Sequence, residues 1–160
     1  MLSEELKREL VEKKPNPSEN IGKLFYRLFR YVQIWHEEKS LENGSYLIKP
    51  GLIALLSNIS SNGSCNRELA ERAFISKQGM SKLLNETLHD GIIEIGKNKN
   101  DSRANNIELT DKGAALLVSI WENNKFLIQN FEHHLGKEKT RNLLELLSEL
   151  SESIKICGKK

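Results

Sequence analysis

Apolar residues recur every three or four positions along most of this chain, which is the period of an amphipathic helix. The apolar stripes stop where the backbone favours a turn, at Pro15-Asn16-Pro17, Asn43-Gly44-Ser45 and Gly136. Ser18, just after the first of these turns, is the predicted N-cap of a long helix. The predicted helices cover residues 1–14, 18–42, 48–59, 66–72, 76–90 and 110–135, with a last helix after Gly136.

The pattern changes for a short stretch between two of these helices. Residues 92–95 and 106–109 are β-prone runs, and the segment between them is polar and rich in Asn and Lys. This pattern predicts a β-hairpin with a long loop. Just before it, helices 66–72 and 76–90 are joined by only Ala73-Phe74-Ile75, which is typical of a helix–turn–helix.

A helix–turn–helix followed by a hairpin predicts a winged helix–turn–helix, whose second helix enters the major groove of DNA. The expected fold class is mainly α with a small β-hairpin wing, plus N- and C-terminal dimerisation helices. We expect one compact domain with four regions. They are a short helix and linker (1–17), a dimerisation helix (18–47), the winged helix–turn–helix (48–113) and C-terminal dimerisation helices (114–160).

Positive charge gathers in the two segments that this fold would place against DNA. Residues 76–84 hold two lysines and no acid, and residues 96–106 hold three bases and one acid. Each segment therefore has a net charge of +2, whereas eight bases and eight acids cancel over residues 64–113. Local charge of this kind favours contact with phosphates.

Several short motifs resemble the MarR-type family of transcriptional regulators. They are Glu68-Leu69-Ala70-Glu71-Arg72, the run from Ser76 to Leu84, His89-Asp90-Gly91-Ile92-Ile93, Asp101-Ser102-Arg103, and Ile107-Glu108-Leu109-Thr110-Asp111-Lys112-Gly113. The resemblance covers residues 21 to 154, and the spacing from Asp101 to Gly113 is its most specific part. The helix–turn–helix alone is shared by many winged-helix families.

The resemblance implies a homodimer that places its two recognition helices in successive major grooves of a pseudo-palindromic site. It implies that Arg103 at the wing tip enters the minor groove and that Asp101 positions it, and a guanidinium suits that narrow, electronegative groove. The chain departs from the family where basic residues often follow the glycine and two apolar residues, because Glu94-Ile95-Gly96 stand there. The wing then contacts DNA through Lys97 and Lys99 instead, or binds DNA more weakly.

The predicted recognition helix supplies the other candidate DNA contacts. Ser76 is the predicted helix cap and a candidate phosphate contact, and Gln78 and Ser81 are candidate base contacts. Lys77 and Lys82 are candidate phosphate contacts, with a plain solvated role as the alternative. Gly79 either allows close approach of the backbone to DNA or has no role. The predicted DNA-binding residues are Ser76, Lys77, Gln78, Ser81, Lys82, Lys97, Lys99 and Arg103.

Two further groups of apolar and aromatic residues have candidate roles. Tyr26, Arg30, Tyr31 and Trp35 are candidates for an effector cavity, with a place in the core or dimer interface as the alternative. The last helix carries Leu143, Leu147, Leu150, Ile154 and Cys157 at the spacing of a helix–helix seam. The predicted dimer interface consists of Ile21, Phe25, Phe131, Leu143, Leu147, Leu150 and Ile154.

Composition limits the remaining possibilities. The chain has 160 residues, a net charge of +2 and two cysteines, and it carries neither a signal-peptide pattern nor an apolar run long enough for a membrane helix. It shows no enzyme signature, and the adjacent His133 and His134 point too far apart to share a metal. We therefore expect a cytoplasmic, non-enzymatic repressor without cofactor, which binds double-stranded DNA as a homodimer and is released by a small molecule or another signal. The alternative is a winged-helix module for protein–protein assembly without specific DNA reading.

Overall fold

The computed structural model describes residues 2–42, 46–97 and 105–154. It divides into two compact units, Met1–Trp35 and His36–Lys160. Helix α2 (Ile21–Glu42) crosses the boundary, and its last turns belong to the second unit. The Cys157 position of the predicted seam lies outside the described residues.

The first unit holds α1 (Glu4–Glu12) and most of α2. Ser3 caps α1, because its hydroxyl accepts a hydrogen bond from the Leu6 amide at 3.3 Å. The prediction that Ser18 caps the next helix is wrong. Residues 17–19 form a turn, and the side chain of Asn20 accepts a hydrogen bond from the Lys23 amide at 3.1 Å, so α2 begins at Ile21.

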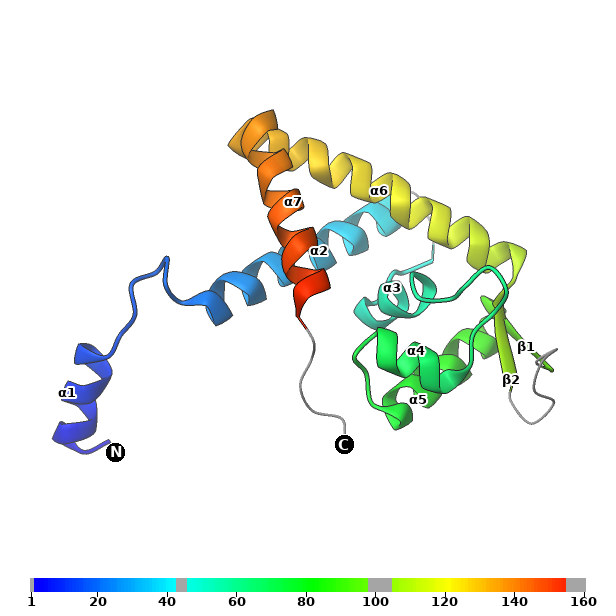
Figure 1. Cartoon of the computed structure of the whole chain (residues 1–160), viewed down its shortest axis with the longest axis horizontal. Coiled ribbons are helices and arrows are strands. Elements are labelled where there is room, and N and C mark those ends of the chain that lie inside the picture. Colours follow the sequence, from blue (N-terminus) through cyan, green and yellow to red (C-terminus); the bar gives the residue numbers. More distant parts are fainter. Residues whose placement is uncertain (1, 43–45, 98–104, 155–160) are drawn as a thin grey trace. The chain divides into compact units, whose positions relative to one another are not determined.

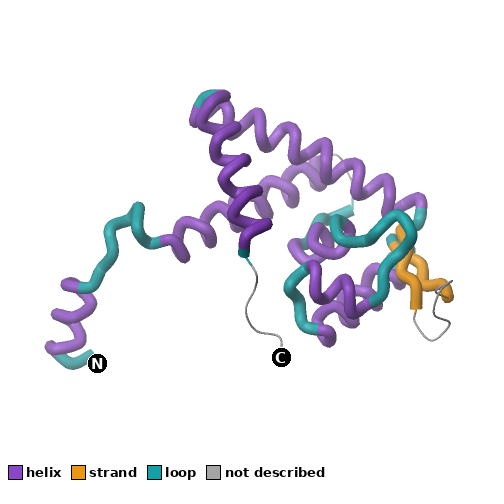
Figure 2. The backbone as a smooth tube through the Cα atoms, viewed as in Figure 1, coloured by secondary structure: helices purple, strands orange, loops and turns teal. Residues whose placement is uncertain are grey.

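The second unit contains the predicted winged helix–turn–helix, and this fold class is confirmed (Figures 1 and 2). Its elements follow in the order α3 (Pro50–Leu56), α4 (Asn66–Arg72), α5 (Lys77–His89), β1 (Ile93–Lys97), β2 (Asn105–Leu109), α6 (Asp111–Leu135) and α7 (Lys137–Ser153). Among the helices described, none has the length and apolar character that crossing a membrane requires.

Two of these elements differ in length from the prediction. The third helix was expected over residues 48–59 but spans only Pro50–Leu56. Pro50 stands at its first position, where the missing amide proton costs nothing. The hairpin strands instead reach further into the polar segment than the apolar pattern indicates, because backbone pairing continues to Lys97 and Asn105.

The core of the second unit is built mainly by apolar side chains of α3, α4, α5, α6 and the wing. Fully buried side chains come from α3 (Leu55), α4 (Leu69), α5 (Met80), the start of the wing (Ile92) and α6 (Ile120). Helix α6 contacts α3, β2 and α7, and α5 contacts α3, α4 and β1. The core therefore fixes α5 between the rest of the helix–turn–helix and the wing.

Candidate nucleic-acid interface

Helix α5 is held in place by its cap and by one buried face. The Ser76 hydroxyl accepts a hydrogen bond from the Gly79 amide at 3.1 Å, so the predicted cap is confirmed. Met80, Leu84 and Thr87 are buried. Since these three recur at intervals of four and three residues, they form one face of the helix, and the opposite face is left to solvent.

The turn before α5 explains the glycine in this helix. Phe74 has a φ of 53°, and the Ile75 amide donates to the Ala70 carbonyl at 3.0 Å, which reverses the chain between α4 and α5. A Cβ added at Gly79 would lie 3.0 Å from Cγ2 of Ile75 and 3.2 Å from Oγ of Ser76. A side chain at Gly79 would therefore be tight against this turn, and Ile75 or Ser76 would have to shift by a few tenths of an ångström to admit it.

The exposed face of α5 carries three of the predicted DNA-binding residues. Lys77, Gln78 and Lys82 are exposed. Ser81 is only half-exposed, and its hydroxyl accepts a hydrogen bond from Nδ2 of Asn66 and donates one to the Lys77 carbonyl, each at 2.8 Å. The structure therefore turns the Ser81 hydroxyl toward α4 and the three longer side chains toward solvent.

Two residues of the same face were missed by the sequence analysis. Asn85 and His89 are exposed and continue the line of Gln78 and Lys82 toward the end of the helix. Steps of four, three and four residues separate the four positions, so they share one face. This spacing is visible in the sequence, but it carries no information until the buried side of α5 is known.

The wing is a two-stranded antiparallel sheet with a short third partner. Strands β1 and β2 pair in a register that sets Ile95 opposite Ile107. Ser64, just before α4, forms a bridge to Ile107 through two backbone hydrogen bonds of 3.0 and 2.8 Å. This bridge ties the wing to the start of the helix–turn–helix.

The charges of the wing are mixed. Glu94 and Glu108 stand directly opposite each other on neighbouring strands and are exposed, an arrangement that destabilises a sheet by like-charge repulsion. Lys97 is the last residue of β1. The predicted contacts Lys99 and Arg103, and the positioning residue Asp101, lie outside the described residues.

A polar cluster joins the end of α5 to two other segments. The Tyr46 hydroxyl donates a hydrogen bond to the side chain of Asp90, the C-cap of α5. Lys112 of α6 donates to the Asp90 carbonyl at 2.7 Å, and its ammonium lies 5.7 Å from the centre of the Tyr46 ring. The hydrogen bond to Asp90 raises the pKa of Tyr46 to about 12, and the same bond lowers the pKa of the Asp90 carboxyl.

Helix α6 begins directly against the residue that leads into the wing. The Thr110 hydroxyl lies 2.7 Å from the Gly91 carbonyl and 3.0 Å from the Ile92 carbonyl, and the Thr110 amide donates to Ile92 at 3.1 Å. The same hydroxyl accepts from the Gly113 amide at 3.1 Å and caps the helix. A Cβ at Gly113 would lie 2.0 Å from the Ile92 oxygen, so only glycine fits there.

One buried histidine lies where the last turns of α2 meet α6. His36 is 1% exposed, and its Nε2 lies 3.0 Å from Oδ1 of Asn124. Its Nδ1 has no hydrogen-bond partner among the described residues. Burial lowers the pKa of His36, and the hydrogen bond to Asn124 opposes that shift only in part.

The candidate effector residues all lie on α2 within the first unit. Tyr26 and Tyr31 are exposed, and Arg30 donates a hydrogen bond to Gln33 at 2.8 Å. The rings of Tyr31 and Trp35 are 6.5 Å apart at an angle of 36°. These contacts are local to the helix, so the effector role stays a prediction.

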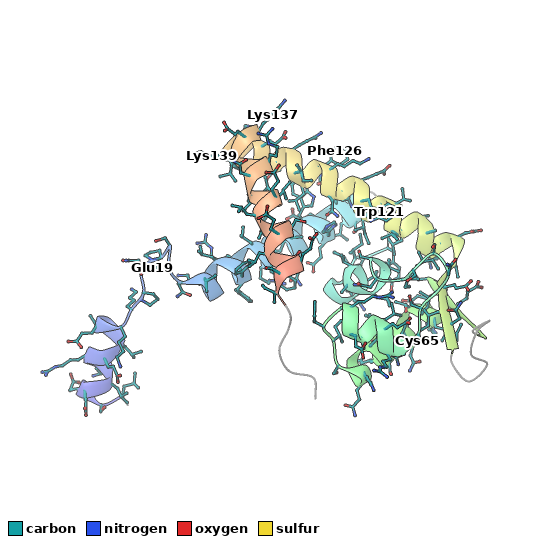
Figure 3. The ribbon with its side chains drawn as sticks, in the orientation of Figure 1. Glu19, Cys65, Trp121, Phe126, Lys137 and Lys139 are labelled. Carbon is teal, nitrogen blue, oxygen red and sulfur yellow. The ribbon has the colours of Figure 1, made fainter. Side chains whose placement is uncertain are left out.

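The candidate dimer-interface residues are mostly exposed in the single chain. Ile21 and Phe25 of α2 are exposed, as are Leu147 and Leu150 of α7, which buries only Thr140. Phe131 and Leu143 are half-buried, and Ile154 ends α7 with an exposed side chain. Trp121 and Phe126, labelled on α6 in Figure 3, are also more than half exposed.

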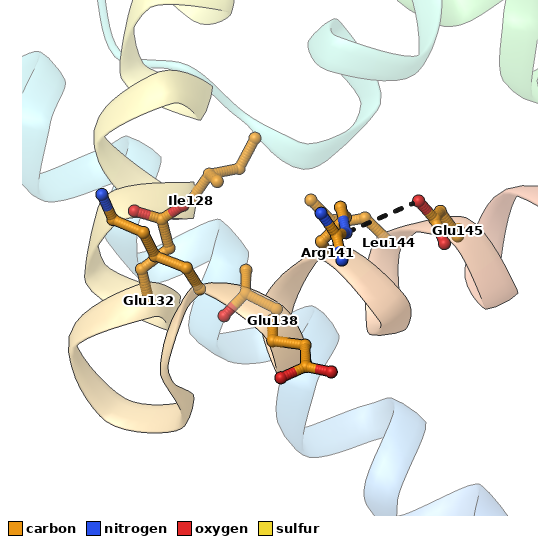
Figure 4. Close-up of a pocket in the computed structure, with 8 residues that line it drawn as sticks. Ile128, Glu132, Glu138, Arg141, Leu144 and Glu145 are labelled. Atoms are coloured by element: carbon orange, nitrogen blue, oxygen red, sulfur yellow. Dashed lines mark ion pairs between the residues drawn. The ribbon is translucent and has the colours of Figure 1, made fainter.

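A groove of about 630 Å³ lies between the end of α6 and the start of α7 (Figure 4). Ile128 and Leu144 give it an apolar wall, and Arg141 lies 3.9 Å from Glu145 at its rim. The buried Thr140 hydroxyl in its lining has no hydrogen-bond partner among the described residues. The groove is therefore mixed in character and lies on the helices that the sequence assigns to dimerisation.

The chain is similar in sequence to one curated transcriptional regulator, whereas no sequence model of a protein family matches it. That relative is the HTH-type transcriptional regulator BilQ from Clostridioides difficile (strain CD3). The two are 31% identical over 94 residues, which make up 58% of this chain and 61% of BilQ. The chain thus matches less than two thirds of the length of BilQ.

Solved structures of transcriptional regulators superpose on most of the chain. A MarR transcriptional regulator from Methanosarcina mazei Go1 has a TM-score of 0.71 at 21% identity, over 84% of this chain and 95% of that one. The S. aureus MepR–DNA complex has a TM-score of 0.67 at 17% identity, over 84% and 98%.

The PcaV transcriptional regulator from Streptomyces coelicolor, in complex with its natural ligand, has a TM-score of 0.67 at 16% identity, over 88% and 98%. Likeness at this level of identity establishes the fold. The motifs between Glu68 and Gly113, together with this superposition, show that the chain has the winged helix–turn–helix fold of the MarR-type transcriptional regulators.

Proposed function

We propose that this protein is a DNA-binding transcriptional repressor that binds a pseudo-palindromic site as a homodimer. The observation that carries the proposal is the exposed side of α5, which presents Lys77, Gln78, Lys82 and Asn85 to solvent, with Glu86 as the one exposed acid of this helix. Side chains of these types contact phosphates and base edges when such a helix lies in the major groove. The MepR structure with DNA is a neighbour with the same fold.

The exposed apolar side chains support a dimer. Both α2 and α7 expose several large apolar side chains, and contiguous exposed apolar surface marks sites of protein–protein contact. Ile21, Phe25, Phe131, Leu143, Leu147, Leu150 and Ile154 are the residues that we assign to the dimer interface. A dimer places its two recognition helices on half-sites about 10–10.5 base pairs apart, and by covering a promoter in this way it blocks transcription.

The release mechanism that we propose is a change in the spacing of the two recognition helices. A signal needs only a different affinity for two dimer conformations to shift the protein away from DNA. Tyr26, Arg30, Tyr31 and Trp35 are the residues that we assign to a small-molecule effector cavity. The PcaV neighbour, which is in complex with its natural ligand, supports a small-molecule effector in general.

The test is a fluorescence-anisotropy titration of the full chain against its own upstream promoter DNA and a scrambled duplex. We expect selective binding of one dimer per site, with log K falling linearly with log salt at a slope of about −0.9 per phosphate neutralised. Sedimentation at the same protein concentration checks the dimer. Absence of duplex binding even at low salt would overturn the proposal.

A second candidate function is a winged-helix module for protein–protein assembly. The pair of carboxylates at Glu94 and Glu108 favours it, because negative charge on the wing weakens contact with phosphates. This candidate predicts weak binding that is equal for both duplexes in the same titration. A library selection for DNA sites then decides between a wrongly chosen promoter and a protein that does not read DNA.

A further inference from the structure

The exposed face of α5 carries two amide side chains that are free to bind. Gln78 lies in the first turn and Asn85 in the third, and both are exposed. Neither side-chain amide makes a hydrogen bond to any group in the part of the chain that the structure describes. Both amides therefore keep their full set of donors and acceptors for a ligand.

The other short polar side chain on this helix is already occupied. Ser81 lies between the two amides in the sequence, but its hydroxyl binds Asn66 and the Lys77 carbonyl. To donate to a base it would have to give up its hydrogen bond to the Lys77 carbonyl. Lys82, which lies between the two amides on this face, ends in a point charge with three donors, which suits a phosphate better than a base edge.

The spacing of the two amides fits the spacing of bases. Seven residues of α-helix turn through two revolutions to within about 20°, so Gln78 and Asn85 point in nearly the same direction. The same seven residues rise about 10.5 Å along the helix axis. Bases on one strand are about 3.4 Å apart, so about 10.5 Å corresponds to about three base-pair steps, or about two where the helix is tilted in the groove.

The chemistry of an amide selects one base. The amide of Asn or Gln can accept from N6 and donate to N7 of adenine at the same time, whereas the other bases offer no matching pair in the major groove. We propose that Gln78 and Asn85 each read an adenine, so that every half-site contains two A·T pairs separated by two or three steps. This inference rests on the proposed DNA-binding function and names the sequence that the function requires.

The test is a selection from a random duplex library with the full-length protein, followed by competition titrations on the selected site. Gln78→Ala and Asn85→Ala are compared with the wild type, and Asn142→Ala, which removes an exposed asparagine from α7, is the matched control. Alanine favours helix more than asparagine does, so the variants should fold. Thermal unfolding of each variant verifies this.

We expect the wild type to select a palindrome whose half-sites each contain the two A·T pairs. Asn85→Ala should then lose roughly tenfold or more of its discrimination at one of these pairs and Gln78→Ala at the other, while Asn142→Ala keeps both preferences. A selected site whose preferences survive both substitutions, or whose two affected pairs lie further apart than three steps, overturns the inference and leaves the regulator in place. If the wild type selects no sequence at all, the proposed function falls together with the inference.

Discussion

Replacing Gly113 by alanine should destabilise the protein, although alanine is the better helix former. Gly113 lies in the first turn of α6, and a Cβ at this position would stand 2.0 Å from the Ile92 oxygen. Ordinary carbon–oxygen contacts are about 3.3 Å or longer, so this oxygen would have to move by about 1 Å. It accepts hydrogen bonds from the amide and the hydroxyl of Thr110, at 3.1 and 3.0 Å, and both would be broken or stretched.

The size of the effect follows from these contacts. Two lost hydrogen bonds cost about 1 kcal/mol each, and overpacking adds about 1–3 kcal/mol. The better helix propensity of alanine than of glycine offsets about 1 kcal/mol of this destabilisation. The expected loss in the free energy of unfolding is therefore about 2–4 kcal/mol.

The assay is urea unfolding followed by circular dichroism, with all proteins at one concentration because a dimer unfolds in a concentration-dependent way. Gly22→Ala is the control, since a Cβ at Gly22 in α2 meets nothing within 4 Å. We expect this control to remain within about 1 kcal/mol of the wild type. If Gly113→Ala is as stable as the wild type, the packing argument for the start of α6 is wrong.

Three further predictions concern single side chains. The pKa of Tyr46 is raised from 10.0 to about 12, so the free energy of unfolding of the wild type should fall as the pH rises through this range. Tyr46→Phe lacks the hydroxyl bound to Asp90, so its free energy of unfolding should fall less over the same pH range. The pKa of His36 is lowered from 6.5, so below pH 6.5 the unfolded chain takes up a proton that the folded protein resists. The free energy of unfolding should therefore fall on acidification, and His36→Gln, which cannot take up a proton, should flatten that fall; equal slopes for both proteins would contradict the argument. Arg103→Ala should weaken binding to the selected site roughly tenfold in anisotropy titrations, and unchanged affinity would remove the wing from the proposed mechanism.

The order and type of the elements could be predicted from the sequence because each leaves a periodic signal. The short turn Ala73-Phe74-Ile75 between two predicted helices is enough to identify the helix–turn–helix, whereas the polar Thr87 on the buried face of α5 leaves no such signal. Boundaries were less certain where two capping residues compete. Ser18 and Asn20 are both good caps, and only the turn over residues 17–19 decides that α2 begins after Asn20.

The candidate site could be predicted only in part. Side chains that are available to contact DNA can be identified only once the hydrogen bonds within the protein are known. Ser81 and Asn85 look equally suitable in the sequence, yet Asn66 of α4, fifteen residues before Ser81, binds the serine and leaves the asparagine free. The bridge from Ser64 to Ile107 involves single residues far apart in the chain and has no periodicity to detect. Such pairings depend on tertiary packing.

The contacts around Ile92 connect α5, the proposed recognition helix, to the long helix α6. Ile92 follows α5 directly, its side chain is fully buried, and its carbonyl is held by Thr110 and pressed against Gly113. Lys112 adds a hydrogen bond to the carbonyl at the end of α5. All these bonds join the start of α6 to the chain between α5 and β1, so the end of α5 and the start of α6 are held together by direct contacts. In the proposed mechanism, a signal that displaces the first turn of α6 would reach the recognition helix through these contacts, without any contact of its own to DNA.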